Sequence, residues 1–255
     1  LPSMQKILFR NLLAFFIVGA GLIRKPEKLE IHKGDIKFLF LRSFCGTIGI
    51  VCNFYAIDHL VLSDANMLNK LSPFFAIIFS YFILKERLTL FQGIAVVVAF
   101  IGALFIIKPT GNMTDPAALI GMLGGAGAGA AYTYVRVLGK RGVNGKLVVM
   151  FFSAFTCLVA LPFVIGNFAP MKWWQTAAMI AAAFGGAGGQ IFVTKAYYYA
   201  PAKELSVFDY SQILFSALMG FLILRQRPDV FSILGYLIIC ATAVVMYFYN
   251  KNRSE

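Results

Sequence analysis

Polar side chains interrupt an apolar stretch of this sequence between residues 64 and 73. Four of them recur at i, i+3, i+4 and i+7, a spacing that places side chains on one face of a helix: Asn66, Asn69, Lys70 and Pro73. That face could form the polar wall of a binding cavity, in which Lys70 attracts a carboxylate or a phosphate. Alternatively, Lys70 could extend its charge to water at the helix end. Pro73 could kink the helix as part of a gate, or it could be a tolerated proline.

A second group of polar residues lies later in the chain and consists of Ser206, Asp209 and Tyr210. Asp209 is the clearest carboxylate inside an apolar stretch, where it could bind an amine or carry a coupling proton. The alternative is a carboxylate in the first turns of a helix, where the helix dipole favours it. Tyr132 and Gln190 lie deep enough in other apolar stretches to face the same cavity, although ordinary hydrogen bonds between helices explain them equally well.

Long apolar stretches carry these residues and fill most of the chain. The sequence of 255 residues is 60% hydrophobic and only 13% charged, whereas a soluble domain of this size carries roughly 25% charged residues. Nine stretches are close to the ~20 residues that a helix needs to cross a bilayer. They are residues 7–23, 36–57, 64–84, 89–107, 117–138, 146–165, 174–197, 204–224 and 230–249. Such stretches predict an all-α membrane protein, because each span must satisfy its own backbone hydrogen bonds in lipid.

The basic residues indicate an orientation in the membrane. The formal net charge is +12, and most Lys and Arg residues fall in alternate connections between spans. The positive-inside rule then places the C-terminus in the cytoplasm and Leu1 on the outer side of the membrane. We expect this membrane to be the plasma membrane. We also expect one further helix before Leu1, because a start outside without a signal segment is unusual. No basic, aromatic-rich segment remains outside the spans, which excludes a nucleic-acid partner.

Residues near the predicted span ends have simpler interpretations. Arg42 lies near the start of a span, and we expect it to extend toward the membrane surface. Trp173, Trp174 and residues 197–199, which are all tyrosines, are typical of interfacial aromatic belts. The four cysteines and two histidines lack the spacing of a disulfide framework or a metal site, so we expect no metal. The glycines at 121, 125 and 129 recur every four residues, which predicts close helix packing and no cofactor site.

An internal match indicates that the chain contains two related halves. A shift of 140 residues brings paired glycines, a polar helix entry and a basic turn into register. The matched residues are Gly46 with Gly186, Gly49 with Gly189, and Lys85, Glu86 and Arg87 with Arg225, Gln226 and Arg227. The shift spans five crossings, so the halves should run in opposite directions, as in inverted-repeat transporters. We therefore expect a first repeat at 1–110, lacking its first helix, and a second at 117–250.

The order of these features resembles the EamA-type repeat of the drug/metabolite transporter superfamily. The first copy is a polar-entered helix with Pro73, the turn at Lys85, Glu86 and Arg87, and a helix with Gly93 and Gly102. The second contains Ala200, Pro201, Phe208, Asp209 and Tyr210, followed by Arg225, Gln226, Arg227 and Pro228. The resemblance implies ten helices in a two-fold inverted repeat, of which nine are visible here. It also implies alternating access to small solutes such as amino acids. The second copy departs from the pattern, because Gln226 replaces the usual glutamate.

These features favour a secondary transporter of a small metabolite, such as an amino acid or a related solute. Lys70 together with Asp209 favours a zwitterion. An organic cation or drug exporter of the same fold is the first alternative, and a non-transporting membrane interaction protein is the second. An enzyme is not expected, because the spans hold no histidine and only scattered acids. We expect a lipid bilayer and a small-molecule substrate as partners, no cofactor, and a monomer or weak homodimer.

Overall fold

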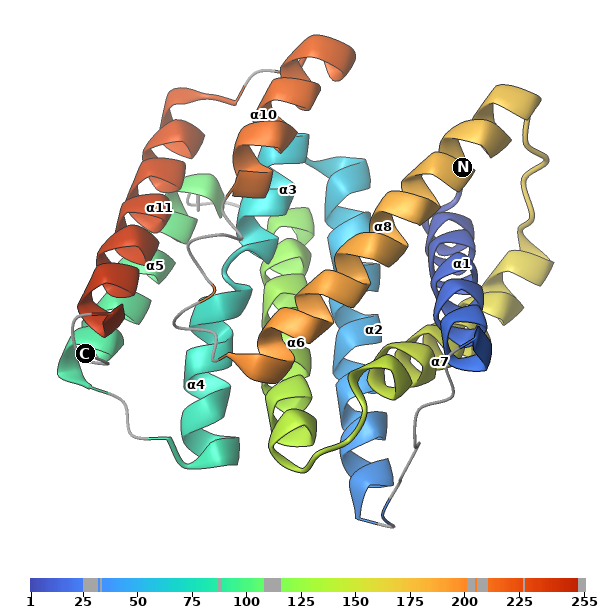
Figure 1. Ribbon diagram of the computed structural model, residues 1–255. Coiled ribbons are helices and arrows are strands. Elements are labelled where there is room, and N and C mark those ends of the chain that lie inside the picture. The colour runs from blue at the N-terminus through green and yellow to red at the C-terminus, as the bar shows by residue number, and fades with distance from the viewer. Residues whose placement is uncertain are drawn as a thin grey trace.

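The structure is a computed structural model that describes residues 1–24, 32, 34–86, 89–107, 116–200, 205, 211–226 and 228–251. Every regular element in these ranges is a helix (Figure 1). The helices are α1 (Ser3–Arg24), α2 (Asp35–His59), α3 (Leu62–Asn69), α4 (Ser72–Leu84), α5 (Leu90–Ile107), α6 (Pro116–Lys140), α7 (Gly145–Gly166), α8 (Trp173–Tyr199), α10 (Ser211–Leu224) and α11 (Val230–Lys251). The prediction of an all-helical protein is confirmed for this part of the chain.

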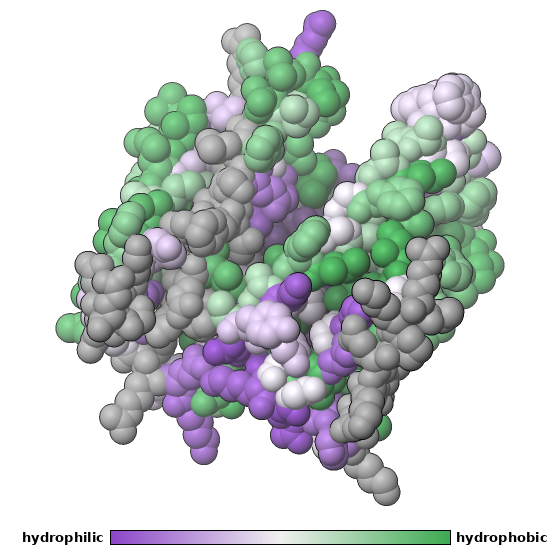
Figure 2. All heavy atoms as spheres, in the orientation of Figure 1, coloured by the Kyte–Doolittle hydropathy of each residue, from purple (hydrophilic) through white to green (hydrophobic). Residues whose placement is uncertain are grey.

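Eight of the predicted spans coincide with segments that are long and apolar enough to cross a membrane. Hydrophobic side chains cover the flanks of the bundle, whereas hydrophilic ones gather at the end drawn lowest (Figure 2). We call this the basic end. Here Arg141 pairs with Asp35 across 2.6 Å and Lys140 pairs with Glu86 across 2.9 Å. The chain is therefore an integral membrane protein. Of the ninth predicted span, 204–224, the structure describes Leu205 and α10.

The third span is divided, which corrects the prediction of one continuous helical face from 66 to 73. α3 ends at Asn69, and α4 begins at Ser72 with Pro73 in its first turn. Pro73 has no amide hydrogen to donate to the Asn69 carbonyl, so the α-helical ladder cannot continue there. Pro73 therefore begins a new helix rather than extending the face that carries Asn66 and Asn69.

Glycines allow α6 to pack closely against its neighbours. A Cβ on Gly125 would lie 2.6 Å from the Leu68 carbonyl oxygen, and one on Gly129 would lie 2.6 Å from that of Ser72. Both carbonyls flank the break between α3 and α4. The four-residue glycine spacing thus lets the backbone of α6 approach the divided span, as small residues do in membrane helices.

Two other groups of helices complete the bundle. α1 packs against α7 and α8, and α2 packs against α6 and α7. α5 pairs with α11 at one side of the bundle (Figure 1). At that pair a Cβ on Gly235 would lie 2.6 Å from the Gly102 carbonyl oxygen, which shows how close the two backbones come. Helices α1, α2, α6 and α8 are thereby arranged around the polar side chains described next.

Candidate functional site

Arg10 extends from α1 across to α8 inside the bundle. Its Nη2 lies 3.5 Å from Oε1 of Gln190, to which it donates a hydrogen bond. A Cβ on Gly186 would lie 2.7 Å from the Arg10 Nε, so this arginine occupies space that only a glycine leaves open. Gln190 in turn donates to the Thr194 hydroxyl at 3.0 Å. The sequence had suggested Gln190 as a cavity residue, and the structure places it against a cation.

Arg42 is buried in α2, which corrects the expectation that it extends to the membrane surface. Only 2% of the residue is exposed, and its guanidinium carbon lies 3.8 Å from the centre of the Phe152 ring. A Cβ on Gly46 would lie 3.0 Å from Nη1, so the side chain runs one turn deeper along α2. The Nε and Nη1 atoms have no hydrogen-bond partner in the described part of the chain.

Tyr132 of α6 lies near both of these arginines. It lies close enough to interact with both guanidinium groups, and the charges of Arg10 and Arg42 also act on each other. The Tyr132 ring stacks on Tyr197, with centroids 4.2 Å apart. Tyr197 is 2% exposed, so its predicted place in an interfacial belt is wrong. We call Arg10, Arg42, Tyr132 and Gln190 the arginine centre.

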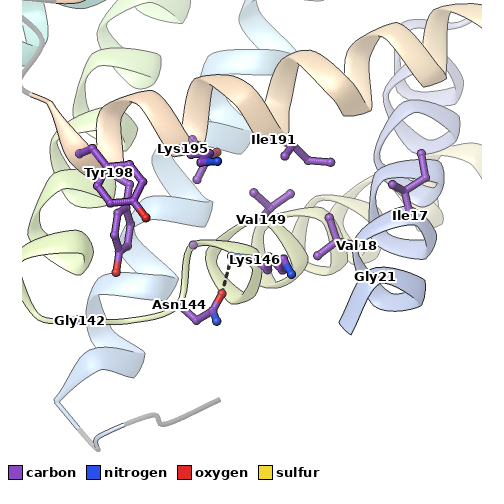
Figure 3. Close-up of a pocket in the computed structure, with 13 residues that line it drawn as sticks. Ile17, Val18, Gly21, Gly142, Asn144, Lys146, Val149, Ile191, Lys195 and Tyr198 are labelled. Atoms are coloured by element: carbon purple, nitrogen blue, oxygen red, sulfur yellow. Dashed lines mark hydrogen bonds between the residues drawn. The ribbon is translucent and has the colours of Figure 1, made fainter. Parts of the chain in front are cut away.

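A cavity of about 560 Å³ lies between α1, α8 and the start of α7, near the basic end (Figure 3). Its walls come from α1, from α8 and from the connection into α7 with the first turns of that helix. They are lined by Ile17, Val18, Gly21, Gly142, Asn144, Gly145, Lys146, Val149, Ile191, Thr194, Lys195, Tyr198 and Tyr199. Thr194 is shared between the cavity wall and the hydrogen bond to Gln190. The cavity therefore approaches Arg10 through Gln190.

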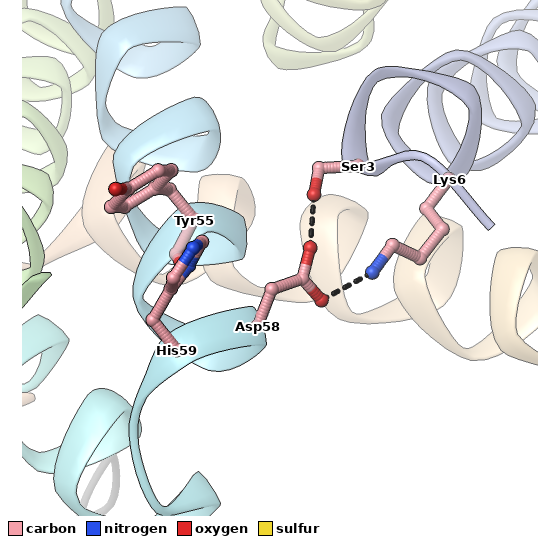
Figure 4. A network of polar contacts seen from close by, with 5 residues as sticks. All are labelled: Ser3, Lys6, Tyr55, Asp58 and His59. Atoms are coloured by element: carbon pink, nitrogen blue, oxygen red, sulfur yellow. Dashed lines mark hydrogen bonds and ion pairs between the residues drawn. The ribbon is translucent and has the colours of Figure 1, made fainter.

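The opposite end of α1 is fastened to its neighbours. Ser3 donates to the Asp58 carboxylate, and Lys6 Nζ lies 2.6 Å from the other oxygen of that carboxylate (Figure 4). The Gln5 side chain also makes two hydrogen bonds with the backbone of Ala169, at 3.0 and 3.1 Å. These contacts join α1 to α2 and to the connection between α7 and α8. We call them the far-end latch.

A separate polar cluster holds α3. Asn66 donates to the Leu62 carbonyl at 2.8 Å and accepts from Gln212 of α10 at 3.4 Å. Tyr236 of α11 donates to Asp64 at 2.5 Å. The predicted residues Asn69 and Lys70 lie at the break that follows α3 and are half-buried. Asn66 therefore belongs to a contact between helices, away from the arginine centre.

The predicted site residues thus divide into three groups. Tyr132 and Gln190 lie in the arginine centre, whereas Asn66, Asn69, Lys70 and Pro73 belong to the divided span. Ser206, Asp209 and Tyr210 lie outside the described residues.

The sequence analysis missed Arg10 and Arg42 as members of one site. The available signal was the register that matches Gly46 with Gly186, because each of these glycines makes room for one arginine.

Comparison with known proteins places the chain among transporters. The model of the EamA-like transporter family matches residues 1–108 and 119–248. The chain is 29% identical over 248 residues to the pseudopaline exporter CntI of Pseudomonas aeruginosa (strain UCBPP-PA14), covering 96% of this chain and 86% of that protein. It is 24% identical to the S-adenosylmethionine uptake transporter of Rickettsia prowazekii (strain Madrid E), covering 84% and 73%. A solved crystal structure with 17% identity has the same fold, with a TM-score of 0.69 over 100% of this chain and 90% of that one.

Proposed function

Because this chain belongs to the EamA-like transporter family, we propose that it is a secondary transporter that moves a small metabolite across the plasma membrane by alternating access. The substrate is an amino acid or a related solute with a carboxylate. The arginine centre is the observation that carries this proposal. Charged residues inside membrane spans are costly, so they persist where they serve a function.

Two features support one state of an alternating-access cycle. The cavity extends from the basic end to Thr194, which is hydrogen-bonded to Gln190 of the arginine centre, while the far-end latch holds α1 against α2. The basic end faces the cytoplasm in this proposal, because positive residues favour that side, and the C-terminus lies there too. Release of the latch and closure of the cavity would then expose the centre to the outside.

An inverted repeat supplies the symmetry for this exchange of states. The family model matches two segments, close to the repeats that we place at 1–110 and 117–250. The glycines matched by the repeat, Gly46 and Gly186, each lie against an arginine, which supports the same register.

The other predicted residues take supporting roles in this proposal. Asn69 and Lys70 line the break of the third span, and Pro73 permits α3 and α4 to move separately as a gate. Ser206, Asp209 and Tyr210 remain candidates for substrate binding in the second half. The protein acts as a monomer or weak homodimer. The positive charges of Arg10 and the buried Arg42 oppose an organic cation at the arginine centre, which weighs against that alternative.

Solute uptake by the purified full chain in proteoliposomes tests the proposal. We expect saturable uptake of a radiolabelled amino acid or related carboxylate, above that of protein-free liposomes. An Asp58→Asn variant weakens the far-end latch and should alter the uptake rate, whereas an exposed substitution such as Lys172→Gln should not. Uptake of an organic cation instead would favour the drug-exporter alternative, and the absence of saturable uptake of any solute class would refute the transporter.

A further inference from the structure

The arginine centre brings together two positive charges without a negative one. Arg10 comes from α1 and Arg42 from α2, and each guanidinium lies close enough to feel the charge of the other. No carboxylate in the described ranges pairs with either group. Two cations in low-dielectric surroundings repel each other strongly. A bound anion would remove this repulsion, so the centre is prepared for negative charge from outside the protein.

We propose that Arg10 and Arg42 each bind one of two separate anionic groups of a single substrate, so that the transported solute is a dicarboxylate or an amino acid derivative with a second carboxylate. This proposal rests on the proposed transport function and narrows its substrate class. Guanidinium groups are planar, always charged and matched to carboxylate geometry, which suits them for this role better than lysine.

The geometry of each arginine supports this assignment. Arg42 is stacked on Phe152 through one ring face, and two of its three guanidinium nitrogens, Nε and Nη1, have no acceptor among the described residues. Such buried donors lose their hydration without compensation unless a ligand accepts from them. Arg10 donates a long hydrogen bond of 3.5 Å to Gln190, which a carboxylate could replace at a shorter distance. Both groups are therefore positioned by the protein but incompletely bonded.

The route to the centre has the same charge preference. Lys146 and Lys195 line the cavity that opens at the basic end, and its inner wall reaches Thr194 beside Gln190. Positive groups that line a cleft raise the local concentration of anions. An anionic solute would thus meet lysines first, then Gln190, and finally the two arginines.

Calorimetric binding to the purified full chain in detergent tests the proposal. The probes are succinate, glutarate and adipate, with butyrate and inorganic phosphate as single-group anions and putrescine as a cation. We expect one dicarboxylate length to bind at least tenfold more tightly than butyrate or phosphate, and putrescine not to bind. The preferred length would report the separation of the two guanidinium groups.

Substitutions then identify the binding groups. Arg42→Gln and Arg10→Gln should each weaken dicarboxylate binding by roughly 10- to 100-fold, as the loss of a hydrogen bond to a charged group predicts. Each should leave a remaining affinity close to that of butyrate. Arg42→Lys keeps the charge and should lose less. Arg225→Gln, which removes the same charge from an exposed turn, is the matched control and should bind as the wild type does. Arg10 and Arg42 lie on different helices, so the misfolding of one variant leaves the other as a test.

The outcomes separate this proposal from the transport function. Equal binding of butyrate and all three dicarboxylates, tighter binding of phosphate, or unchanged affinity in both arginine variants would overturn the two-anion site. Saturable uptake of a neutral or cationic solute that persists in Arg42→Gln would overturn it too, while the protein would remain a transporter. Dicarboxylate binding without uptake in proteoliposomes would instead refute transport and leave the binding site in place.

Discussion

The turn after α4 and the turn after α10 have the same backbone geometry at opposite ends of the bundle (Figure 1). Lys85 and Arg225 are the two non-glycine residues with positive φ in the described chain, at 55° and 54°. In each turn the next amide donates to a carbonyl six residues earlier, from Glu86 to Ser80 and from Gln226 to Gly220. This is the register that the 140-residue shift predicts.

The two turns nevertheless contact different partners. The Glu86 carboxylate pairs with Lys140 at the basic end, whereas the Gln226 oxygen accepts from the Leu62 amide at the N-terminus of α3 at 3.0 Å. The same difference appears in the helices. Gly49 of α2 lies against the backbone of α6, whereas a Cβ built on its match Gly189 of α8 would meet no atom of another described element within 4 Å. The two halves therefore repeat the same local backbone geometry but make different contacts with neighbouring helices.

The largest effect should come from Gly49→Ala compared with Gly189→Ala. A Cβ at 49 would lie 2.9 Å from the Ala128 amide nitrogen, and a backbone atom cannot rotate away. We expect Gly49→Ala to cost about 1–3 kcal/mol of stability, as overpacking does, and Gly189→Ala to cost nothing. Thermal unfolding in detergent measures both, and equal midpoints would contradict the difference between α2 and α8.

The second comparison concerns the space for the arginines. Gly186→Ala would push a Cβ to 2.7 Å from the Arg10 Nε, which is the flexible end of a side chain, so binding should suffer more than folding. We expect roughly tenfold slower uptake, equivalent to about 1.4 kcal/mol, with little change in unfolding temperature. Gly46→Ala would place a Cβ 2.9 Å from the buried Phe152 ring as well as 3.0 Å from Arg42 Nη1, so it should lower both the uptake rate and the unfolding temperature. Gly185→Ala is the control, because it adds a methyl group in open space, and a similar loss there would argue against the arginine explanation.

A smaller effect is expected at Gln226. Gln226→Ala removes the acceptor of the Leu62 amide and should cost roughly 0.5–1.5 kcal/mol, the net value of such a hydrogen bond. Gln226→Glu keeps the oxygen and should match the wild type or exceed it, since a negative group favours a helix N-terminus. The unfolding midpoints of the two variants decide this, and a tolerated alanine would show that the bond contributes little.

The smallest effect should come from the matching residue of the first half. Glu86→Gln removes an ion pair whose side chains are 46% and 35% exposed, and such pairs contribute about 0.2–1 kcal/mol. The loss of stability caused by Glu86→Gln should decrease as salt is added, because salt screens exposed charges. Titration of the unfolding midpoint with NaCl measures this. If Glu86→Gln lost more stability than Gln226→Ala, the contact of the first turn would contribute more than that of the second, contrary to our prediction.

Most of the fold could be predicted because lipid leaves continuous apolar segments only one structure, the helix. The division at Lys70 was harder to anticipate. Pro73 shows that a hydrogen bond is missing, but whether the span bends or separates depends on its surroundings. Here Gly125 and Gly129 of α6 lie against the carbonyls of Leu68 and Ser72, and no local pattern around Pro73 contains that contact.

The site was predictable in part for a similar reason. Tyr132 and Gln190 were found because they are polar residues far from either end of their helices. Arg10 and Arg42 have long side chains that can reach water from one or two turns inside a helix, and the direction each takes depends on the neighbouring helix. Gly46 and Gly186 leave the space that turns both side chains inward. This information resides in tertiary contacts between residues far apart in the chain.

In the transport cycle that we propose, the paired positive charges would make the rate depend on the membrane potential. An elementary charge that crosses 100 mV exchanges about 2.3 kcal/mol. A doubly negative solute would neutralise both guanidinium groups. The loaded protein would then switch between its inward-open and outward-open states without moving net charge across the membrane. The unloaded protein keeps both positive charges when it returns to its starting state. The membrane potential would drive this return, because it pulls the two unoccupied arginines toward the negative side of the membrane.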